Sequence, residues 1–124
     1  MKSILIISSI ALLATTTVAN AEYMDVIAMQ MKPGCTLQQF TGVISDFNKW
    51  GAQHGYNAKF AVPIQDQDLT TAFFVGTTKN AATFGAAWDA WRDGQADANS
   101  TPAKLQARFN ECVTNKTRSG YDVY

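Results

Sequence analysis

The single histidine of this sequence is the side chain best suited to proton transfer near neutral pH. His54 follows Trp50 by four residues and precedes Tyr56 by two. An aromatic pocket around it would hold a base that titrates close to neutrality. The alternative is a histidine at the C-terminal end of a helix, where the helix dipole favours it. No serine, cysteine or carboxylate is spaced to form a catalytic triad with it, so the sequence predicts no catalytic residue.

The aromatic residues offer a second chemistry, the binding of a flat or apolar ligand. Trp88 and Trp91 are three residues apart, which places them on one face of a helix. That spacing fits an aromatic platform, and it fits equally a stripe packed in a core. For a cleft between helices and sheet, the expected ligand-binding residues are Trp50, His54, Tyr56 and Trp88.

Sulfur-containing side chains raise the question of a metal site. Met29, Met31 and Cys35, with the histidine, provide the thioether, thiolate and imidazole groups that suit Cu(I). Residues two apart on a strand share one face, however, and core methionines have the same spacing. The acidic tract 66–68 lacks the other oxygen ligands and the glycine of a calcium loop. Without a glycine-rich phosphate loop or paired-cysteine zinc spacing, the sequence predicts no metal site and no cofactor.

The first residues have the pattern of a cleaved export signal. A lysine precedes the apolar run 4–13, and a small-x-small sequence, Ala-Asn-Ala, ends at Ala21. The apolar run is too short to span a bilayer, so no membrane anchor is expected. We expect a Sec-type signal peptide over 1–21, cleavage after Ala21, and a mature protein, 22–124, that is periplasmic or secreted.

The mature part is long enough for a single compact domain. Lys2 leaves with the signal peptide, so nine basic residues face ten acidic ones and the formal charge is about −1. A chain this close to neutral has no basic surface for nucleic acid or for an anionic membrane. The composition therefore excludes these two classes of partner.

Cys35 and Cys112 are the two cysteines of the sequence. An even number in an exported protein favours a disulfide, and the alternative is two separate buried thiols. On the chain-entropy model, closing so long a loop stabilises a fold by at most about 4–5 kcal/mol. We expect a disulfide between Cys35 and Cys112.

The spacing of apolar residues predicts the elements of the first half of the domain. Residues 23–31 have the composition of a strand that is apolar on both faces, and a Lys-Pro-Gly turn follows. Thr36 and Gln39 form a capping box for a helix. The apolar stripe of that helix comprises Leu37, Phe40, Val43, Ile44 and Phe47. Residues 56–65 alternate between apolar and polar side chains, and Pro63 within them indicates an edge strand.

The second half repeats this pattern and adds one helix. Residues 69–78 are apolar on both sides, which predicts a central strand. A helix is expected over 81–93, with Gly94 as its C-cap. Its apolar stripe comprises Phe84, Ala87, Trp88 and Trp91. A short third helix begins near Pro102, and its buried face comprises Leu105, Phe109 and Cys112. Residues 116–124 are expected to form the last strand.

A βαββαβ order with right-handed crossovers predicts the α+β class and the ferredoxin-like sandwich. This fold has a four-stranded antiparallel sheet with helices on one face, and here an extra short helix precedes the last strand. The first and third strands are central, and the second and fourth are edges. Cys35 follows the first strand and Cys112 precedes the fourth, so both lie at the same rim of the sheet. The topology and the disulfide therefore predict each other.

The helices of such a fold cover only one face of the sheet. The central strands nevertheless carry large apolar side chains on both faces, with Phe73 beside Phe74 as one case. An uncovered apolar face favours a second copy packed against it. With this order and this face, the chain from about Tyr23 to Tyr124 resembles the dimeric α+β barrel superfamily, which includes small cofactor-free monooxygenases and stress-responsive barrel proteins. The resemblance implies a homodimer, and we transfer no catalytic residue from it.

These observations leave two classes of function open. The first is an exported homodimeric binding or interaction module whose aromatic-lined cleft takes a small apolar or aromatic ligand. The alternative is a cofactor-independent monooxygenase- or isomerase-like enzyme, which orients a small activated substrate in a dry pocket. An enclosed pocket holding His54 beside polar groups would favour the enzyme. An exposed His54 with the tryptophans in the core would favour the binding module.

Overall fold

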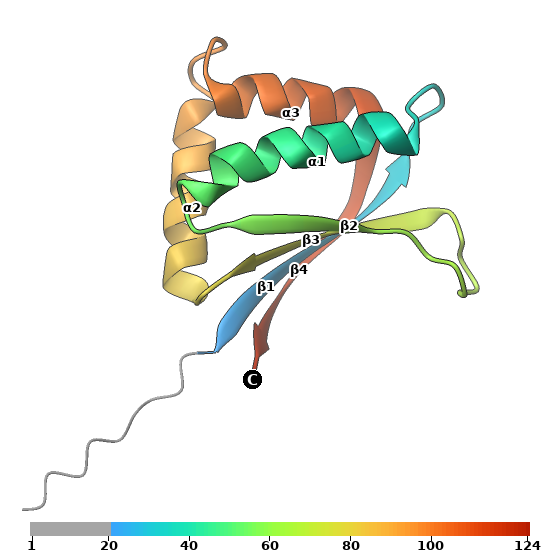
Figure 1. Cartoon of the computed structure of the whole chain (residues 1–124), viewed down its shortest axis with the longest axis horizontal. Helices are drawn as coiled ribbons and strands as arrows, with labels where there is room; N and C mark the ends of the chain where they lie inside the picture. Colours follow the sequence, from blue (N-terminus) through green and yellow to red (C-terminus); the bar gives the residue numbers. More distant parts are fainter. Residues whose placement is uncertain (1–20) are drawn as a thin grey trace, which may run out of the picture.

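The computed structural model of the protein describes residues 21–124. In chain order the elements are β1 (Glu22–Met31), α1 (Leu37–Ala52), β2 (Asn57–Ala61), β3 (Thr71–Thr78), α2 (Ala81–Gly94), α3 (Thr101–Cys112) and β4 (Val113–Val123). The order, including the extra helix before the last strand, is the one predicted (Figure 1). The expected signal peptide, apart from Ala21, lies outside the described residues. Within residues 21–124, no helix combines the length and the apolar character needed to cross a membrane.

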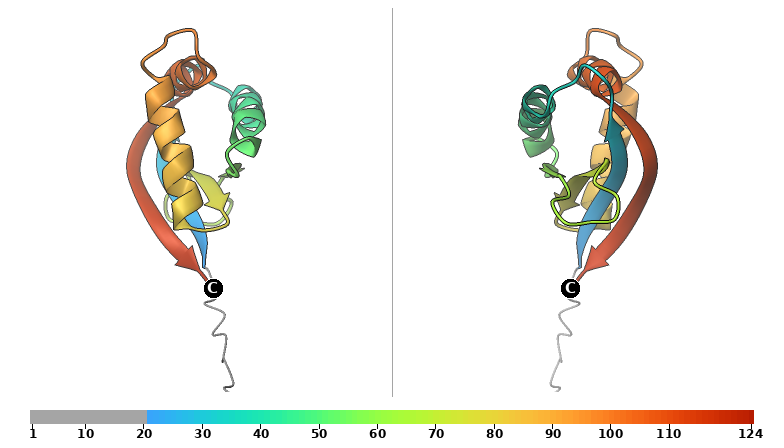
Figure 2. Two further views of the ribbon diagram at one scale, coloured as in Figure 1. Left: turned by 90° about the vertical axis from the view of Figure 1, so that its left-hand side faces the viewer. Right: turned by 90° about the vertical axis from the view of Figure 1, so that its right-hand side faces the viewer.

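The four strands form one antiparallel sheet in the order β2-β3-β1-β4. As predicted, β1 and β3 are central, and β2 and β4 are the edges. Figure 1 and Figure 2 show the helices on one side of this twisted sheet, where α1 contacts β2 and α2 contacts β1 and β3. The protein therefore has the predicted α+β ferredoxin-like fold.

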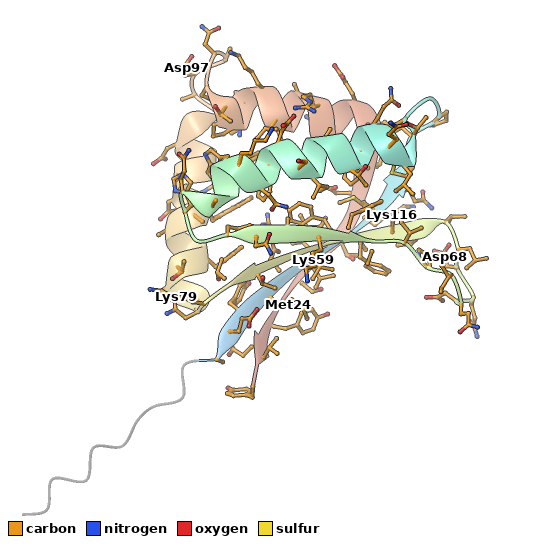
Figure 3. The ribbon with its side chains drawn as sticks, in the orientation of Figure 1. Met24, Lys59, Asp68, Lys79, Asp97 and Lys116 are labelled. Atoms are coloured by element: carbon orange, nitrogen blue, oxygen red, sulfur yellow. A yellow bond between two sulfur atoms is a disulfide. The ribbon has the colours of Figure 1, made fainter. Side chains whose placement is uncertain are left out.

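Alternation along the strands separates a buried face of the sheet from an open one. On β3, Ala72 and Phe74 are buried beneath the helices, whereas Phe73 and Val75 are only half-buried on the opposite face. Met24 of β1 pairs with a residue of that same open face, and its side chain points away from the helices (Figure 3). The core thus lies between one face of the sheet and the three helices.

The helix ends follow the local sequence closely. The side chain of Thr36 accepts a hydrogen bond from the backbone N–H of Gln39, and the Gln39 side chain accepts one from Thr36, which completes the predicted capping box. Leu37, included in the predicted stripe, is exposed because it begins the helix at its outer rim. The C-cap prediction for Gly94 is wrong: this residue is helical, and Pro102 of α3 packs where its side chain would be.

The second strand is shorter than its alternating sequence predicts. β2 pairs with β3 only from Asn57 to Ala61, and Pro63 lies beyond its end. No helix covers the loop that follows, so Ile64 is 90% exposed. In this loop the carboxylate of Asp68 accepts hydrogen bonds from three neighbouring N–H and O–H groups, and Figure 3 shows the loop projecting beyond the sheet. β2 is an edge strand, as predicted. The reason is that it pairs with β3 alone, and Pro63, on which the prediction rested, lies outside the strand.

The predicted disulfide is present and closes the rim of the sheet. Cys35 follows β1 and Cys112 ends α3, and a disulfide joins them. The backbone N–H of Lys32 also donates to the carbonyl of Cys112 at 2.8 Å. Val113 then pairs at once with Met31, so β4 begins three residues before its predicted start.

Candidate functional site

A cavity of about 140 Å³ lies between the buried face of the sheet and the helices. We call it the central cavity. Aromatic side chains make up most of its wall, and they come from every layer of the fold. These side chains are Phe47, Trp50, Tyr56, Phe74, Phe84, Trp88, Trp91 and Phe109.

The aromatic wall is held by edge-to-face packing around Phe47. Its ring centroid lies 5.3 Å from that of Tyr56 and 5.4 Å from that of Phe74. Trp91 and Phe109, from α2 and α3, approach Phe47 at 5.5 and 5.9 Å in the same geometry. Such contacts add to the energy of burial and fix the ring orientations. The wall is therefore preorganised for a flat or apolar ligand.

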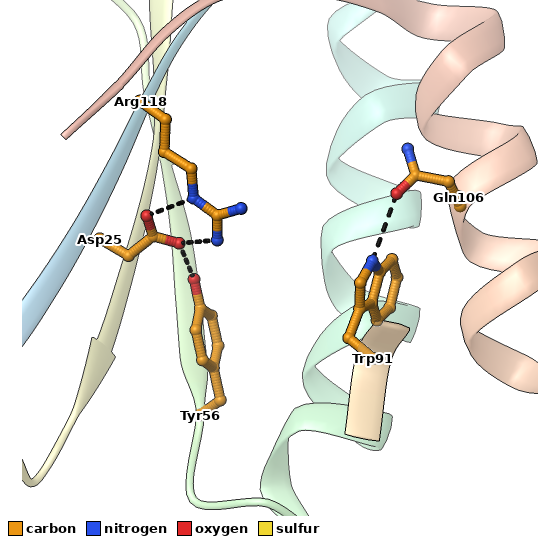
Figure 4. Close-up of polar contacts among 5 residues, drawn as sticks. All are labelled: Asp25, Tyr56, Trp91, Gln106 and Arg118. Atoms are coloured by element: carbon orange, nitrogen blue, oxygen red, sulfur yellow. Dashed lines mark hydrogen bonds and ion pairs between the residues drawn. The ribbon is translucent and has the colours of Figure 1, made fainter. Parts of the chain in front are cut away.

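A buried polar network closes one side of the central cavity. The side chain of Asp25 on β1 is 2% exposed, and its carboxylate accepts two hydrogen bonds from the guanidinium of Arg118 on β4. The hydroxyl of Tyr56 donates a third hydrogen bond to the same carboxylate, at 2.6 Å (Figure 4). Arg118 and Tyr56 line the cavity, while Asp25 lies behind them. The carboxylate of Asp25 and the guanidinium of Arg118 form an ion pair that has no net charge and good hydrogen-bond geometry.

Arg118 also packs on the aromatic wall. Its guanidinium carbon lies 4.0 Å from the ring centroid of Trp88 and 5.7 Å from that of Phe84, within the range of a cation–π contact. Burial alone lowers the pKa of Arg118, but the hydrogen bonds and negative charge of Asp25 outweigh it and raise the pKa overall. The guanidinium therefore stays charged.

Tyr56 is fixed in its neutral form. Burial, together with the adjacent negative charge of Asp25, raises the pKa of the Tyr56 hydroxyl far above its ordinary value. The hydroxyl also lies directly over Gly76 of β3, where a Cβ would come within 2.0 Å of it. Tyr56 thus acts as a hydrogen-bond donor to Asp25 and not as a base.

Amide groups supply the other polar part of the cavity wall. The indole N–H of Trp91 donates to the side-chain oxygen of Gln106 at 3.3 Å, as Figure 4 shows. The side-chain nitrogen of Gln106 donates in turn to Asn110 at 2.9 Å. Asn115 of β4 also lines the cavity.

The structure brings together three of the four residues predicted to bind a ligand. Trp50, Tyr56 and Trp88 line the central cavity. His54 does not: its ring packs at a tilt against Trp50 with centroids 4.3 Å apart, and it lines a shallow surface depression beside α2 instead. The reason is local, because α1 ends before this residue and Gly55, at φ +65°, turns the chain back toward β2. His54 is therefore not placed to act on a molecule in the cavity.

Sequence reasoning missed Asp25 and Arg118. Asp25 gives a signal, since it is the one charged residue among the inward-facing positions of β1, which are otherwise apolar or aromatic. Arg118 gives none, because its strand is mostly polar and has a second basic residue, Lys116, that could equally have faced inward. Of the sulfur groups considered for a metal, Met29 is buried in the core and Cys35 is in the disulfide. Within residues 21–124, no cluster of three or more His, Cys, Asp or Glu side chains is arranged to hold a metal ion.

The comparisons with known proteins identify the fold. No protein-family model matches the sequence, and no curated protein matches it. A cofactor-independent oxygenase from Streptomyces nogalater, SnoaB, is similar in structure, with a TM-score of 0.55 and 8% identity over 84% of this chain and 94% of that one. A dimeric ferredoxin-like protein of unknown function from Thermobifida fusca has a TM-score of 0.55 at 11% identity, over 84% of this chain and 92% of its own.

A hydroxynitrile lyase from Passiflora edulis is also similar, with a TM-score of 0.53 and 14% identity over 84% of this chain and 94% of its own. These likenesses agree with the ferredoxin-like α+β fold that the sequence predicted. At such low identity they establish a shared fold, and the two proteins with a named activity, the oxygenase and the lyase, differ in that activity.

Proposed function

We propose that the protein is an exported, homodimeric binding protein that holds a small apolar or aromatic ligand in the central cavity. The observation that carries this proposal is the preorganised aromatic wall with one charged hydrogen-bond donor, Arg118, at its side. Pockets that bind small molecules combine an apolar lining with a few placed polar groups in this way.

Binding is favoured over catalysis because, within residues 21–124, the candidate proton-transfer groups either lie outside the cavity or are engaged in hydrogen bonds. His54 lies outside it, and Asp25 is engaged by three hydrogen bonds from Arg118 and Tyr56. Tyr56 holds its proton to high pH. A general base must reach the proton that it removes, and none of these groups is free to do so.

The open face of the sheet supports the homodimer. Met24 and Val26 of β1 share this face with Phe73 and Val75 of β3, and Val26 stands directly opposite Val75. Every residue of β4 after Val113 is exposed as well, which leaves a long unpaired edge. A second copy would cover both, and the similar protein from Thermobifida fusca is dimeric.

Export is supported by the start of the fold. β1 begins at Glu22, the first residue after the expected cleavage site. A disulfide also suits an oxidising compartment. Expression of the full chain in a host with a Sec system should yield a periplasmic protein whose N-terminus, by mass spectrometry, is Glu22. A cytoplasmic product that retains Met1 would contradict export.

Substitutions at two alanines of α2 test whether the ligand binds in the central cavity. Ala87 lines the central cavity and is buried, whereas Ala86 is exposed on the same helix. Toluene and benzene, titrated by calorimetry and tryptophan fluorescence, should bind the wild-type protein and Ala86→Phe but not Ala87→Phe. If neither compound binds the wild type, or if Ala87→Phe binds them equally well, the proposal is wrong.

Sedimentation of the wild-type protein and of a variant altered on the open face tests the proposed homodimer. Sedimentation at micromolar concentration should give twice the subunit mass for the wild-type protein. Val26→Lys places a charge in the proposed interface and should give monomers, whereas Gln38→Lys, on an exposed position of α1, should not. A wild-type protein that sediments as a monomer would refute the homodimer.

A cofactor-independent oxygenase is the second candidate, favoured by one observation. One nitrogen of Arg118 is not used by Asp25, and such a donor could stabilise an oxyanion formed on a substrate in the cavity. SnoaB, which is similar in fold, is a cofactor-independent oxygenase. Oxygen uptake with an easily oxidised phenol, without added metal or cofactor, tests this candidate, and it should disappear in Arg118→Met. No uptake with any such substrate would exclude it.

A further inference from the structure

We infer that the ligand of the central cavity is an uncharged compound with one aromatic ring and, beside that ring, a hydrogen-bond acceptor such as a carbonyl oxygen. The acceptor binds Arg118. This inference rests on the proposed binding function and gives the ligand its chemical class. Three features of the cavity carry it: its size, its free donor and its charge.

The size of the cavity limits the ligand to about one ring. Its volume is about 140 Å³. An apolar protein cavity of about 150 Å³ holds one benzene molecule. The wall packs tightly around Phe47, so a second fused ring would have to displace core side chains.

The free donor is the third nitrogen of Arg118. A guanidinium has donors on all three nitrogens. Nε donates to Oδ1 of Asp25 and Nη2 donates to Oδ2, and among the described residues Nη1 has no acceptor. Figure 4 shows this nitrogen pointing away from Asp25, toward the side on which Trp91 and Gln106 lie. An acceptor on a ring held between the aromatic walls would therefore meet Nη1.

The charge of the site favours an uncharged acceptor. The positive charge of Arg118 is already balanced by Asp25, which is buried and has no other ion-pair partner among the described residues. The remaining polar groups of the wall, Tyr56, Gln106 and Asn115, are neutral. A carboxylate ligand would bring an unbalanced negative charge close to the buried carboxylate of Asp25, which is unfavourable. A carbonyl oxygen accepts the same hydrogen bond without this cost.

Three ligands of similar size separate these features in the wild-type protein. Acetophenone has an uncharged acceptor, toluene has none, and benzoate carries a charge. Calorimetry at neutral pH should give acetophenone a dissociation constant about tenfold lower than that of toluene, as one net hydrogen bond to a charged group implies. Its dissociation constant should also be lower than that of benzoate, whose charge is unfavourable beside Asp25. Equal affinity for toluene, or for benzoate, would overturn the inference and leave the proposed binding function intact. Binding of none of the three would overturn both.

Removal of the Asp25 charge provides a second test. Asp25→Asn keeps the shape of the network but leaves the charge of Arg118 unbalanced, so benzoate should bind this variant more tightly than acetophenone. The control is Asp89→Asn, which removes the exposed partner of Arg92 on α2 and should keep the wild-type preference. An unchanged preference in Asp25→Asn would overturn the inference. Should that variant not fold, the wild-type series still decides.

Discussion

Asp25 and Arg118 are separated by 93 residues in the sequence and joined by two hydrogen bonds in the fold, with Nε to Oδ1 at 2.8 Å and Nη2 to Oδ2 at 2.7 Å. The pair links central strand β1 to edge strand β4, where Arg118 stands opposite Ile27. It also forms the polar side of the central cavity. One interaction therefore serves both the stability of the sheet and the character of the candidate site.

Breaking this pair should destabilise the fold. Arg118→Met leaves the buried carboxylate of Asp25 without its counter-charge, and we expect the free energy of unfolding to fall by about 2–4 kcal/mol. The side chain of Arg118 is 35% exposed, so water relieves part of the cost. Urea denaturation measures the change. Arg92→Met breaks an exposed pair on α2 and should change the stability by less than about 1 kcal/mol. Equal effects of the two variants would contradict this assignment.

Tyr56 should make the fold sensitive to alkaline pH. Its pKa is raised above the ordinary value of 10 in the folded protein. Above that pH the unfolded chain loses the proton that the folded protein retains, so the folded protein binds more protons and its stability falls as pH rises. Denaturation midpoints measured on both sides of this value should drop more steeply for the wild type than for Tyr56→Phe. Tyr124→Phe, at an exposed terminal residue, should behave like the wild type.

Gly76 should not tolerate a side chain. An alanine Cβ at this position would come within 2.0 Å of the Tyr56 hydroxyl, so the ring would have to leave Asp25. We expect Gly76→Ala to lower the free energy of unfolding by about 1–3 kcal/mol. Gly42 in α1 has open space around it, and Gly42→Ala should instead stabilise the protein by about 0.5–1 kcal/mol. Thermal unfolding of both variants checks the opposite signs.

The disulfide should contribute strongly to stability. It closes a loop of 77 residues, and Cys35→Ala with Cys112→Ala should lower the free energy of unfolding by up to about 4–5 kcal/mol. A reductant should lower the melting temperature of the wild type but not that of the double variant. Thiol labelling of the unreduced, denatured protein should find no free thiol, and two labelled thiols would refute the bridge in the isolated protein.

The sequence by itself determined the order of the elements, because the apolar spacing that marks a helix or a strand is local. It also determined the capping box of Thr36 and Gln39, since both partners lie within one turn. With two cysteines in the chain there was one possible intramolecular disulfide, and the predicted topology placed Cys35 beside Cys112. These features need no knowledge of how distant segments pack.

Only the tertiary structure decided the candidate site. Asp25 gains a counter-charge because β4 folds against β1 in one register, and that register places Arg118 and not another basic residue on the inner face. His54 lies outside the cavity because a single turn at Gly55 determines its direction. The sequence placed Trp50, Tyr56 and Trp88 on inward faces, but whether they close around a space or fill it depends on the distance between layers. That distance results from the packing of all the side chains together, which no local pattern records.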